Sequence, residues 1–154
     1  MHPALRQVMQ EAIEACSRGT GCWVKGKLEK AVVLFTEAIR LDPQYARAYC
    51  NRGTVYCELG DLDAAIADFD EAIRLRPDYA RAYNNRGVAR KMQGNLDRAI
   101  ADYTEAIRID PTYADAYRNR AVAHARQGDA AQAKKDHAEH EKIKARRKEA
   151  SRRR

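Results

Sequence analysis

The sequence predicts an all-α protein built from a tandem repeat of paired helices. Three observations indicate this fold. Prolines recur every 34 residues, at Pro43, Pro77 and Pro111. Glycines recur at the same interval, at Gly26, Gly60, Gly94 and Gly128. Aligning residues 46–79 on residues 80–113 gives 20 identities in 34 positions. A period of this length is typical of a solenoid in which each repeat is one small group of packed elements.

Length and composition agree with a folded repeat domain. The chain has 154 residues, of which 45% are hydrophobic and 33% charged. This excludes a disulfide miniprotein, a collagen and a disordered chain. The longest apolar run, residues 31–35, is far short of the roughly 20 residues that a membrane-spanning helix needs. The first residues lack a secretion signal, so we expect a cytoplasmic protein with reduced cysteines.

The first repeat, residues 12–45, is imperfect in its first half. Two glycines in Gly19–Gly21 weaken a helix there. Apolar residues from Leu5 to Trp23 nevertheless keep helical spacing. One long helix over residues 3–25 is therefore predicted, with a break near Gly19–Gly21 as the alternative.

The second and third repeats, residues 46–79 and 80–113, are complete. Helical spacing predicts a first helix over residues 46–59. Gly60 ends this helix, since glycine adopts the left-handed conformation at little cost. Asp61 caps the next helix through its side-chain oxygen. That helix carries an apolar stripe made of Leu62, Ala65, Ile66, Phe69, Ala72 and Ile73, and the proline stops it.

The last repeat, residues 114–147, departs from the pattern in its second half. His137 and His140 stand where the core aromatic residue and an alanine belong, and no proline follows. A polar terminal helix suits the end of a solenoid. We therefore divide the chain into a repeat body, residues 1–133, and a capping helix with a basic tail, residues 134–154.

The repeat resembles the tetratricopeptide (TPR) family. The motif Tyr49-x2-Arg52-Gly53-x2-Tyr56 is followed by Ala65-x3-Phe69, Ala72 and Pro77. Tyrosine replaces the usual tryptophan, and arginine replaces the usual leucine. The resemblance implies a right-handed superhelical solenoid of about four helix–turn–helix repeats. It also implies that the first helix of each repeat lines a concave groove in which peptides bind.

Transferred to this sequence, the groove positions predict a partner-binding set. Its members are Arg47, Asn51, Thr54, Arg81, Asn84, Asn85, Val88, Met92, Arg118, Asn119 and Val122. Asn51, Asn85 and Asn119 recur at the period, and an amide can pair with the backbone of an extended peptide. The alternative is that each asparagine bonds a neighbouring helix and stabilises stacking.

The charge of the predicted groove leans positive. Its positive side chains are Lys91, Arg126 and the arginines of the partner-binding set, and its negative side chains are Glu58 and Asp115. Arginine binds carboxylates well, so an acidic segment or a free C-terminus is the expected ligand.

Some family members hold the C-terminal carboxylate of heat-shock chaperones. Asn51 and Arg81 match two of the positions that do so. Cys16, Thr20 and Asn85 occupy the other positions and do not match.

The periodic arginines, Arg52, Arg86 and Arg120, are interpreted as structural. Their stems should pack between helices while the guanidinium reaches water or a carboxylate of the next repeat. Carboxylates such as Asp68 and Asp102 are expected on exposed faces.

No catalytic motif occurs, so we expect no enzymatic activity, no cofactor and no metal. Cys16, Cys50 and Cys57 are interpreted as small buried hydrophobic residues, with a redox or metal role as the alternative. His137 and His140 are expected on the surface.

The basic tail is a second candidate surface. Residues 134–154 carry a net charge of +6 of the +7 of the whole chain. Its arginine and lysine cluster consists of Arg146, Arg147, Lys148, Arg152, Arg153 and Arg154. Such a run binds nucleic-acid phosphates or anionic surfaces.

The leading interpretation is a protein-interaction scaffold that captures a peptide or helix in its groove. The alternatives are an adaptor associated with nucleic acid or an anionic surface through the tail, and self-association through the solenoid ends near Trp23.

Overall fold

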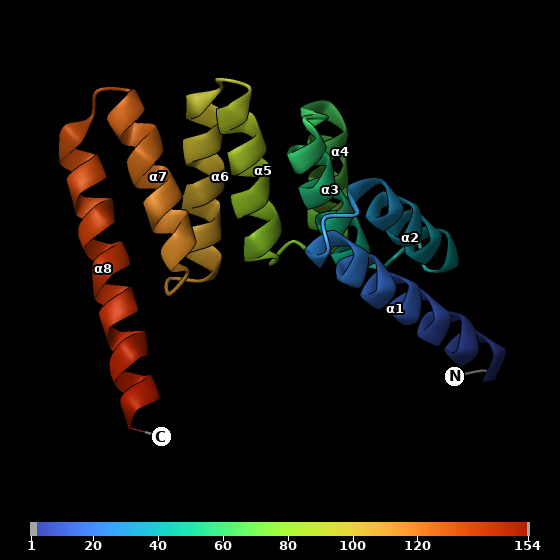
Figure 1. Ribbon diagram of the computed structural model, residues 1–154. Helices are drawn as coiled ribbons and strands as arrows, with labels where there is room; N and C mark the ends of the chain where they lie inside the picture. The colour runs from blue at the N-terminus through green and yellow to red at the C-terminus, as the bar shows by residue number, and fades with distance from the viewer. Residues whose placement is uncertain (1–2, 154) are drawn as a thin grey trace. The chain divides into compact units, whose positions relative to one another are not determined.

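The computed structural model describes residues 3–153 and confirms the all-α prediction. Within these residues the chain forms eight helices and no strand (Figure 1). Their bounds are α1 Pro3–Val24, α2 Leu28–Leu41, α3 Ala46–Leu59, α4 Leu62–Leu75, α5 Ala80–Met92, α6 Leu96–Ile109, α7 Ala114–Arg126 and α8 Ala130–Arg152.

The helices belong to two compact units. Unit 1 is Met1–Pro77 and unit 2 is Asp78–Arg154. Consecutive helices form antiparallel pairs, α1 with α2 and α3 with α4 in unit 1, and α5 with α6 and α7 with α8 in unit 2 (Figure 1). Within unit 1 the first helices α1 and α3 also touch, and within unit 2 α5 touches α7.

The long first helix is confirmed, because α1 runs unbroken through Gly19–Gly21. Packing explains why residue 19 is a glycine. A Cβ atom there would lie 2.8 Å from Cε1 of Phe35. The same close approach recurs at Gly53 against Phe69 and at Gly87, where a Cβ atom would lie 2.7 Å from Cε1 of Tyr103. Glycine at this position therefore lets the first helix of a repeat approach the aromatic ring of the second.

The helix ends follow the sequence signals. Gly60 adopts a φ of 82°, and its backbone N–H donates to carbonyls of the last turn of α3. An Oδ atom of Asp61 accepts a hydrogen bond from the N–H of Ala64 at 3.1 Å, which caps α4. Asn95 and Asp129 cap α6 and α8 in the same way.

The core repeats one arrangement of a large ring among small side chains. Phe35, Phe69 and Tyr103 are fully buried, one in each of α2, α4 and α6. The small side chains around them include Ala31, Ala38, Ala48, Ala65, Ala72, Ala82, Ala99 and Ala106. Alanine allows close helix packing but buries little apolar area itself. The ring therefore supplies most of the buried apolar area of each repeat, and burying one ring stabilises the fold by roughly 1.5–3 kcal/mol.

Helix α8 is polar, as predicted, and runs without a break through residue 133. Its inward side carries Asp136, His140 and Ile143. The surface prediction is therefore wrong for His140, whose Nδ1 lies 2.9 Å from the carbonyl oxygen of Ala114. The imidazole replaces an alanine and uses its ring nitrogen to satisfy a backbone group. His137 is exposed.

None of the helices in the described part of the chain is both long enough and apolar enough to cross a membrane.

Candidate functional site

The periodic arginines form buried ion pairs inside their own repeats. Arg52 donates to both carboxylate oxygens of Asp68, from Nη2 at 2.7 Å and from Nε at 2.8 Å. Its Nη1 donates to the hydroxyl of Thr36 in the preceding repeat at 2.9 Å. The structural role is as expected, but the predicted partner in the next repeat is wrong. The prediction that Asp68 and Asp102 are exposed is also wrong, because they are 6% and 3% exposed.

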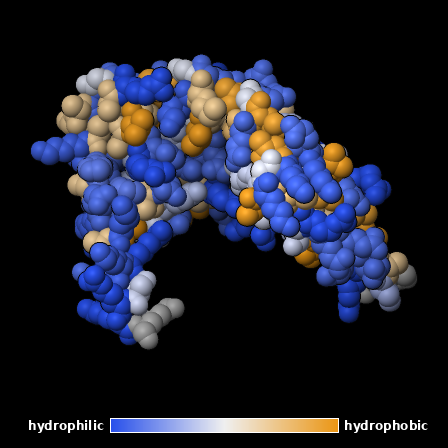
Figure 2. All heavy atoms as spheres, viewed as in Figure 1, coloured by the Kyte–Doolittle hydropathy of each residue, from blue (hydrophilic) through white to orange (hydrophobic). Residues whose placement is uncertain are grey.

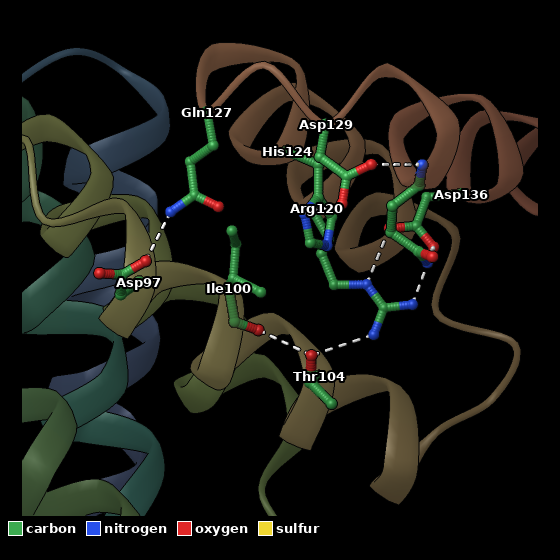
Figure 3. A network of polar contacts seen from close by, with 9 residues as sticks. Asp97, Ile100, Thr104, Arg120, His124, Gln127, Asp129 and Asp136 are labelled. Atoms are coloured by element: carbon green, nitrogen blue, oxygen red, sulfur yellow. Dashed lines mark hydrogen bonds and ion pairs between the residues drawn. The ribbon is translucent and has the colours of Figure 1, made fainter.

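Unit 2 contains the same arrangement twice. Asp102 accepts from two arginines, from Nη2 of Arg86 at 2.7 Å and from Nη1 of Arg90 at 2.8 Å. Figure 3 shows the other copy, in which Arg120 donates to both oxygens of Asp136 at 2.8 Å and to Thr104 at 3.0 Å. The Thr104 hydroxyl in turn donates to a carbonyl of its own helix.

Tyrosine rings complete each arginine site. The guanidinium carbon of Arg52 lies 5.9 Å from the ring centre of Tyr49 and 5.8 Å from that of Tyr56. The hydrogen bond to Asp68 raises the pKa of Arg52. Burial raises the pKa of Asp68 by more than Arg52 lowers it, so this carboxylate depends on its arginine to stay ionised. These arginine and aspartate side chains neutralise each other inside the repeat, so their charges do not bind a ligand.

In unit 1, the predicted groove residue Asn51 is buried. Its amide donates to the thiol sulfur of Cys16 at 3.7 Å, from α3 to α1. This is the stacking contact of the alternative interpretation. Thr54 donates to a carbonyl of its own helix, at 2.8 Å, while Arg47 is exposed.

Arg47 lies at a small pocket of unit 1. The pocket has a volume of about 240 Å³ and is lined by Ile13, Cys16, Ser17, Thr20, Tyr45 and Arg47. These side chains come from α1, from the start of α3 and from the residue before it. The lining therefore combines an apolar side chain, hydroxyl groups and one exposed cation.

In unit 2, asparagines again link the first helices. The amide of Asn119 donates to the side-chain oxygen of Asn84 at 2.9 Å, from α7 to α5. Asn84 donates to the side-chain oxygen of its neighbour Asn85 at 3.1 Å. The bond from Asn119 to Asn84 joins α7 to α5, which is the helix-stacking contact of the alternative interpretation.

The exposed side chains beside these asparagines are apolar and cationic. Val122 is 44% exposed and Met92 52% exposed, while Arg118 and Arg126 are exposed and Val88 and Lys91 half-buried. We call these six residues the α5–α7 face. Burial lowers the pKa of Lys91, and the positive charges of Arg126 and Arg118 lower it further. Arg81, another predicted groove residue, lies with its guanidinium 5.7 Å from the ring centre of Tyr79.

All four cysteines are free thiols. Cys16 and Cys50 are buried. Burial raises the pKa of the half-buried Cys57 to about 11. Among residues 3–153, no group of three or more His, Cys, Asp or Glu side chains is placed to hold a metal ion.

Sequence reasoning missed the aspartate partners of the arginines. The signal was present, because Asp68, Asp102 and Asp136 recur at the same 34-residue period, each 16 residues after an arginine. A pair of opposite charges that recurs together at a fixed spacing predicts a contact repeated in each copy.

Comparisons with known proteins agree with this geometry. A family profile described as TPR repeat matches residues 24–60, 53–94 and 89–128. No curated protein sequence matches the chain significantly.

Solved structures are similar over most of the chain. The crystal structure of MamA is 24% identical, with a TM-score of 0.82 over 95% of this chain and 88% of that one. The first TPR of Spaghetti (RPAP3), bound to the HSP90 peptide SRMEEVD, is 25% identical, with a TM-score of 0.75 over 77% of this chain and 94% of that one. The Arabidopsis OM64 TPR domain is 28% identical, with a TM-score of 0.71 over 77% of this chain and 95% of that one.

Proposed function

The chain belongs to the TPR repeat family, and from this premise we propose that it is an adaptor without catalytic activity. It binds a peptide or helical segment of a partner protein, with a preference for acidic segments. The segment lies along the exposed side of the first helices of unit 2, on the α5–α7 face.

One observation carries this proposal. The α5–α7 face exposes valine and methionine side chains between cations, whereas Arg52, Arg86 and Arg120 are paired with carboxylates in the interior. Exposed apolar side chains rimmed by charge are typical of protein-interaction surfaces. Arg118 has an exposed contact of 3.3 Å with Asp115, which water weakens. The face therefore presents positive charge that an acidic segment can neutralise.

A structural relative supports the choice of ligand. The peptide bound by the first TPR of RPAP3, SRMEEVD, contains three acidic residues. It also contains methionine and valine, each next to an acidic residue. The α5–α7 face combines the complementary properties, cations with apolar contact area.

The basic tail is the surface of the second candidate function, binding to nucleic acid or an anionic surface. Its cations within the described residues are exposed along the end of α8, which Figure 2 shows as hydrophilic. Arg147 uses its guanidinium within unit 2, donating to the carbonyl of Thr112 at 2.7 Å. Arg154 lies outside the described residues. The tail cations surround the helix rather than sharing one side, which favours a solvated helix end over a shaped site.

Self-association near Trp23 receives less support. The indole of Trp23 is half-buried, packs against the core of unit 1 and donates to Glu58 at 2.8 Å. The Trp23 ring is thus used within unit 1, whereas Leu5, Met9 and Ile13 of the same helix are exposed.

Selection from a random peptide library displayed on phage tests the proposed function. The wild-type chain is compared with Met92→Asp/Val122→Asp, two exposed changes, and with a truncation after Ala145. Binding of selected peptides is measured by fluorescence anisotropy. We expect acidic peptides that bind the wild type and the truncation and lose about tenfold or more in affinity for the aspartate variant. Peptides whose binding is lost only in the truncated chain would contradict the proposal. A selection that enriches no peptide would also contradict it.

A further inference from the structure

Residues 35 apart face each other on the first helices of both units. Cys16 contacts Asn51 in unit 1, and Asn84 contacts Asn119 at the equivalent positions of unit 2. Two helical turns later, seven residues on, the same faces meet again. In unit 1 this second level is the pair Trp23 and Glu58, in which the indole N–H donates to the carboxylate at 2.8 Å.

The equivalent second level in unit 2 is occupied by two cations. Adding the 68 residues of two repeats converts Trp23 into Lys91 and Glu58 into Arg126. The charge of Arg126 acts on the Lys91 ammonium, as does that of Arg118, which agrees with this register. In unit 1 the Trp23 indole donates a hydrogen bond to the Glu58 carboxylate. In unit 2 the equivalent residues, Lys91 and Arg126, are both hydrogen-bond donors and both positively charged.

Arg90, the residue before Lys91, is a cation of unit 2 that a buried carboxylate neutralises. Arg90, next to Lys91 in the chain, lies 2.8 Å from the carboxylate of Asp102. The two charged groups that lower the pKa of Lys91, Arg126 and Arg118, are both cations. Partial burial of a cation beside like charges costs free energy, and an added negative charge would offset that cost.

We propose that Lys91 and Arg126, with Arg118 beside them, form an anchor that binds a carboxylate of an acidic protein segment, whose adjacent apolar side chain packs on Val88, Met92 and Val122. This inference rests on the proposed function and specifies its partner and its central contact. A carboxylate between the two cations would accept from both, as the Glu58 carboxylate accepts from Trp23 in unit 1.

The surroundings of the anchor favour a peptide over a nucleic acid. Single-stranded nucleic acids bind through aromatic rings on which bases stack. The two tyrosines of α5 and α7, Tyr83 and Tyr117, lie against Arg86 and Arg120, with the guanidinium carbons 5.4 Å and 5.8 Å from the ring centres. The side chains next to the anchor are aliphatic or thioether groups, which suit a leucine or methionine of a partner.

Parallel selections test the anchor. Random peptides on phage are panned against the wild type, against Lys91→Gln/Arg126→Gln, and against Arg98→Gln/Arg108→Gln. The last variant removes the same charge from exposed positions of α6. Circular dichroism first verifies that each protein is helical, and anisotropy then gives the affinity of each selected peptide.

We expect the wild type and the α6 control to enrich peptides with Asp or Glu beside an apolar residue. The anchor variant should bind these peptides about tenfold or more weakly, because two charged contacts are lost. Peptides that bind all three proteins equally would overturn the anchor and leave the proposed function standing. A selection without any enrichment would overturn both, and peptides without an acidic residue would overturn the anchor. Binding of an oligothymidine lost only in the anchor variant would also overturn it, in favour of nucleic acid.

A further variant separates binding from folding. Lys91→Trp/Arg126→Glu copies the unit 1 pair into unit 2. It should raise the melting temperature while abolishing binding of the acidic peptides. A fall in the melting temperature of both this variant and Lys91→Gln/Arg126→Gln would show that the two cations stabilise the fold, which contradicts their assignment to ligand binding.

Discussion

Replacing Asp102 by asparagine should destabilise unit 2 more than replacing Asp68 destabilises unit 1. Both carboxylates are buried, and each binds the arginine 16 residues earlier at 2.7 Å. Asp102 also binds Arg90, at 2.8 Å. The same substitution therefore leaves one cation without its carboxylate in unit 1 and two cations in unit 2.

The exposures of the partners set the magnitude. Breaking a buried ion pair by removing one partner costs about 3–5 kcal/mol. The side chains of Arg52 and Arg86 are 17% and 16% exposed, so some water remains and about 3 kcal/mol applies to each. Arg90, 19% exposed, should add about 1 kcal/mol in unit 2. We expect about 3 kcal/mol for Asp68→Asn and about 4 kcal/mol for Asp102→Asn.

Hydrogen exchange read by mass spectrometry on the intact chain in increasing urea is the appropriate assay. Repeat proteins open locally, so peptides from α3–α4 and α5–α6 report the two units separately. Glu71→Gln is the control. Its contact with Arg74 is short, at 2.6 Å, but exposed, and no measurable change is expected. A loss of protection in unit 2 equal to or smaller than that in unit 1 would refute the reasoning.

Three further results are expected. Gly87→Ala should destabilise by about 1–3 kcal/mol in urea unfolding, since its Cβ meets the Tyr103 ring, whereas Gly21→Ala should stabilise by about 0.5–1 kcal/mol because nothing lies within 4 Å. Alkylation of Cys57 at pH 8 should be about a hundredfold slower than in the unfolded chain, and stability should fall as pH rises from about 9 to about 11, because the thiol pKa is raised on folding. Ile143→Ala should cost about 2 kcal/mol by loss of buried area, again in urea unfolding.

The helices could be predicted from the sequence because their signals are local. The left-handed glycine Gly60, the capping Asp61 and the stripe around Phe69 each act within a few residues. A period of 34 residues then repeats the result. The long α1 was the harder case, and the close approach of Gly19 to Phe35 explains a glycine that local propensity alone disfavours.

The polar contacts could not be predicted by the same reasoning. Helical-face arguments place a charged residue outside unless its partner is known, which misplaced Asp68 and Asp102. The partner lies 16 residues away, on the other helix of the pair, where only the tertiary fold brings it into contact. His140 was misplaced for the same reason, since its acceptor is the carbonyl of Ala114 on α7.

The substitutions that depart from the TPR pattern are coupled to one another. An arginine in place of the usual leucine would be costly in a packed core. Here Arg52 lies against the rings of Tyr49 and Tyr56, and Asp68 neutralises it. The tyrosine, the arginine and the aspartate thus form one set of coupled contacts, which recurs around Arg52, Arg86 and Arg120.

The same comparison between repeats separates stability from function. Where a charge recurs with its partner, as Arg52 does with Asp68, its role is internal, and the ion pair forms in each repeat that carries both residues. Where equivalent positions change from Trp23 and Glu58 to Lys91 and Arg126, two cations replace a hydrogen-bonded pair. Folding does not favour that exchange, whereas a ligand carrying a negative charge would. The pair Lys91 and Arg126 is therefore where the binding specificity of this chain should be sought.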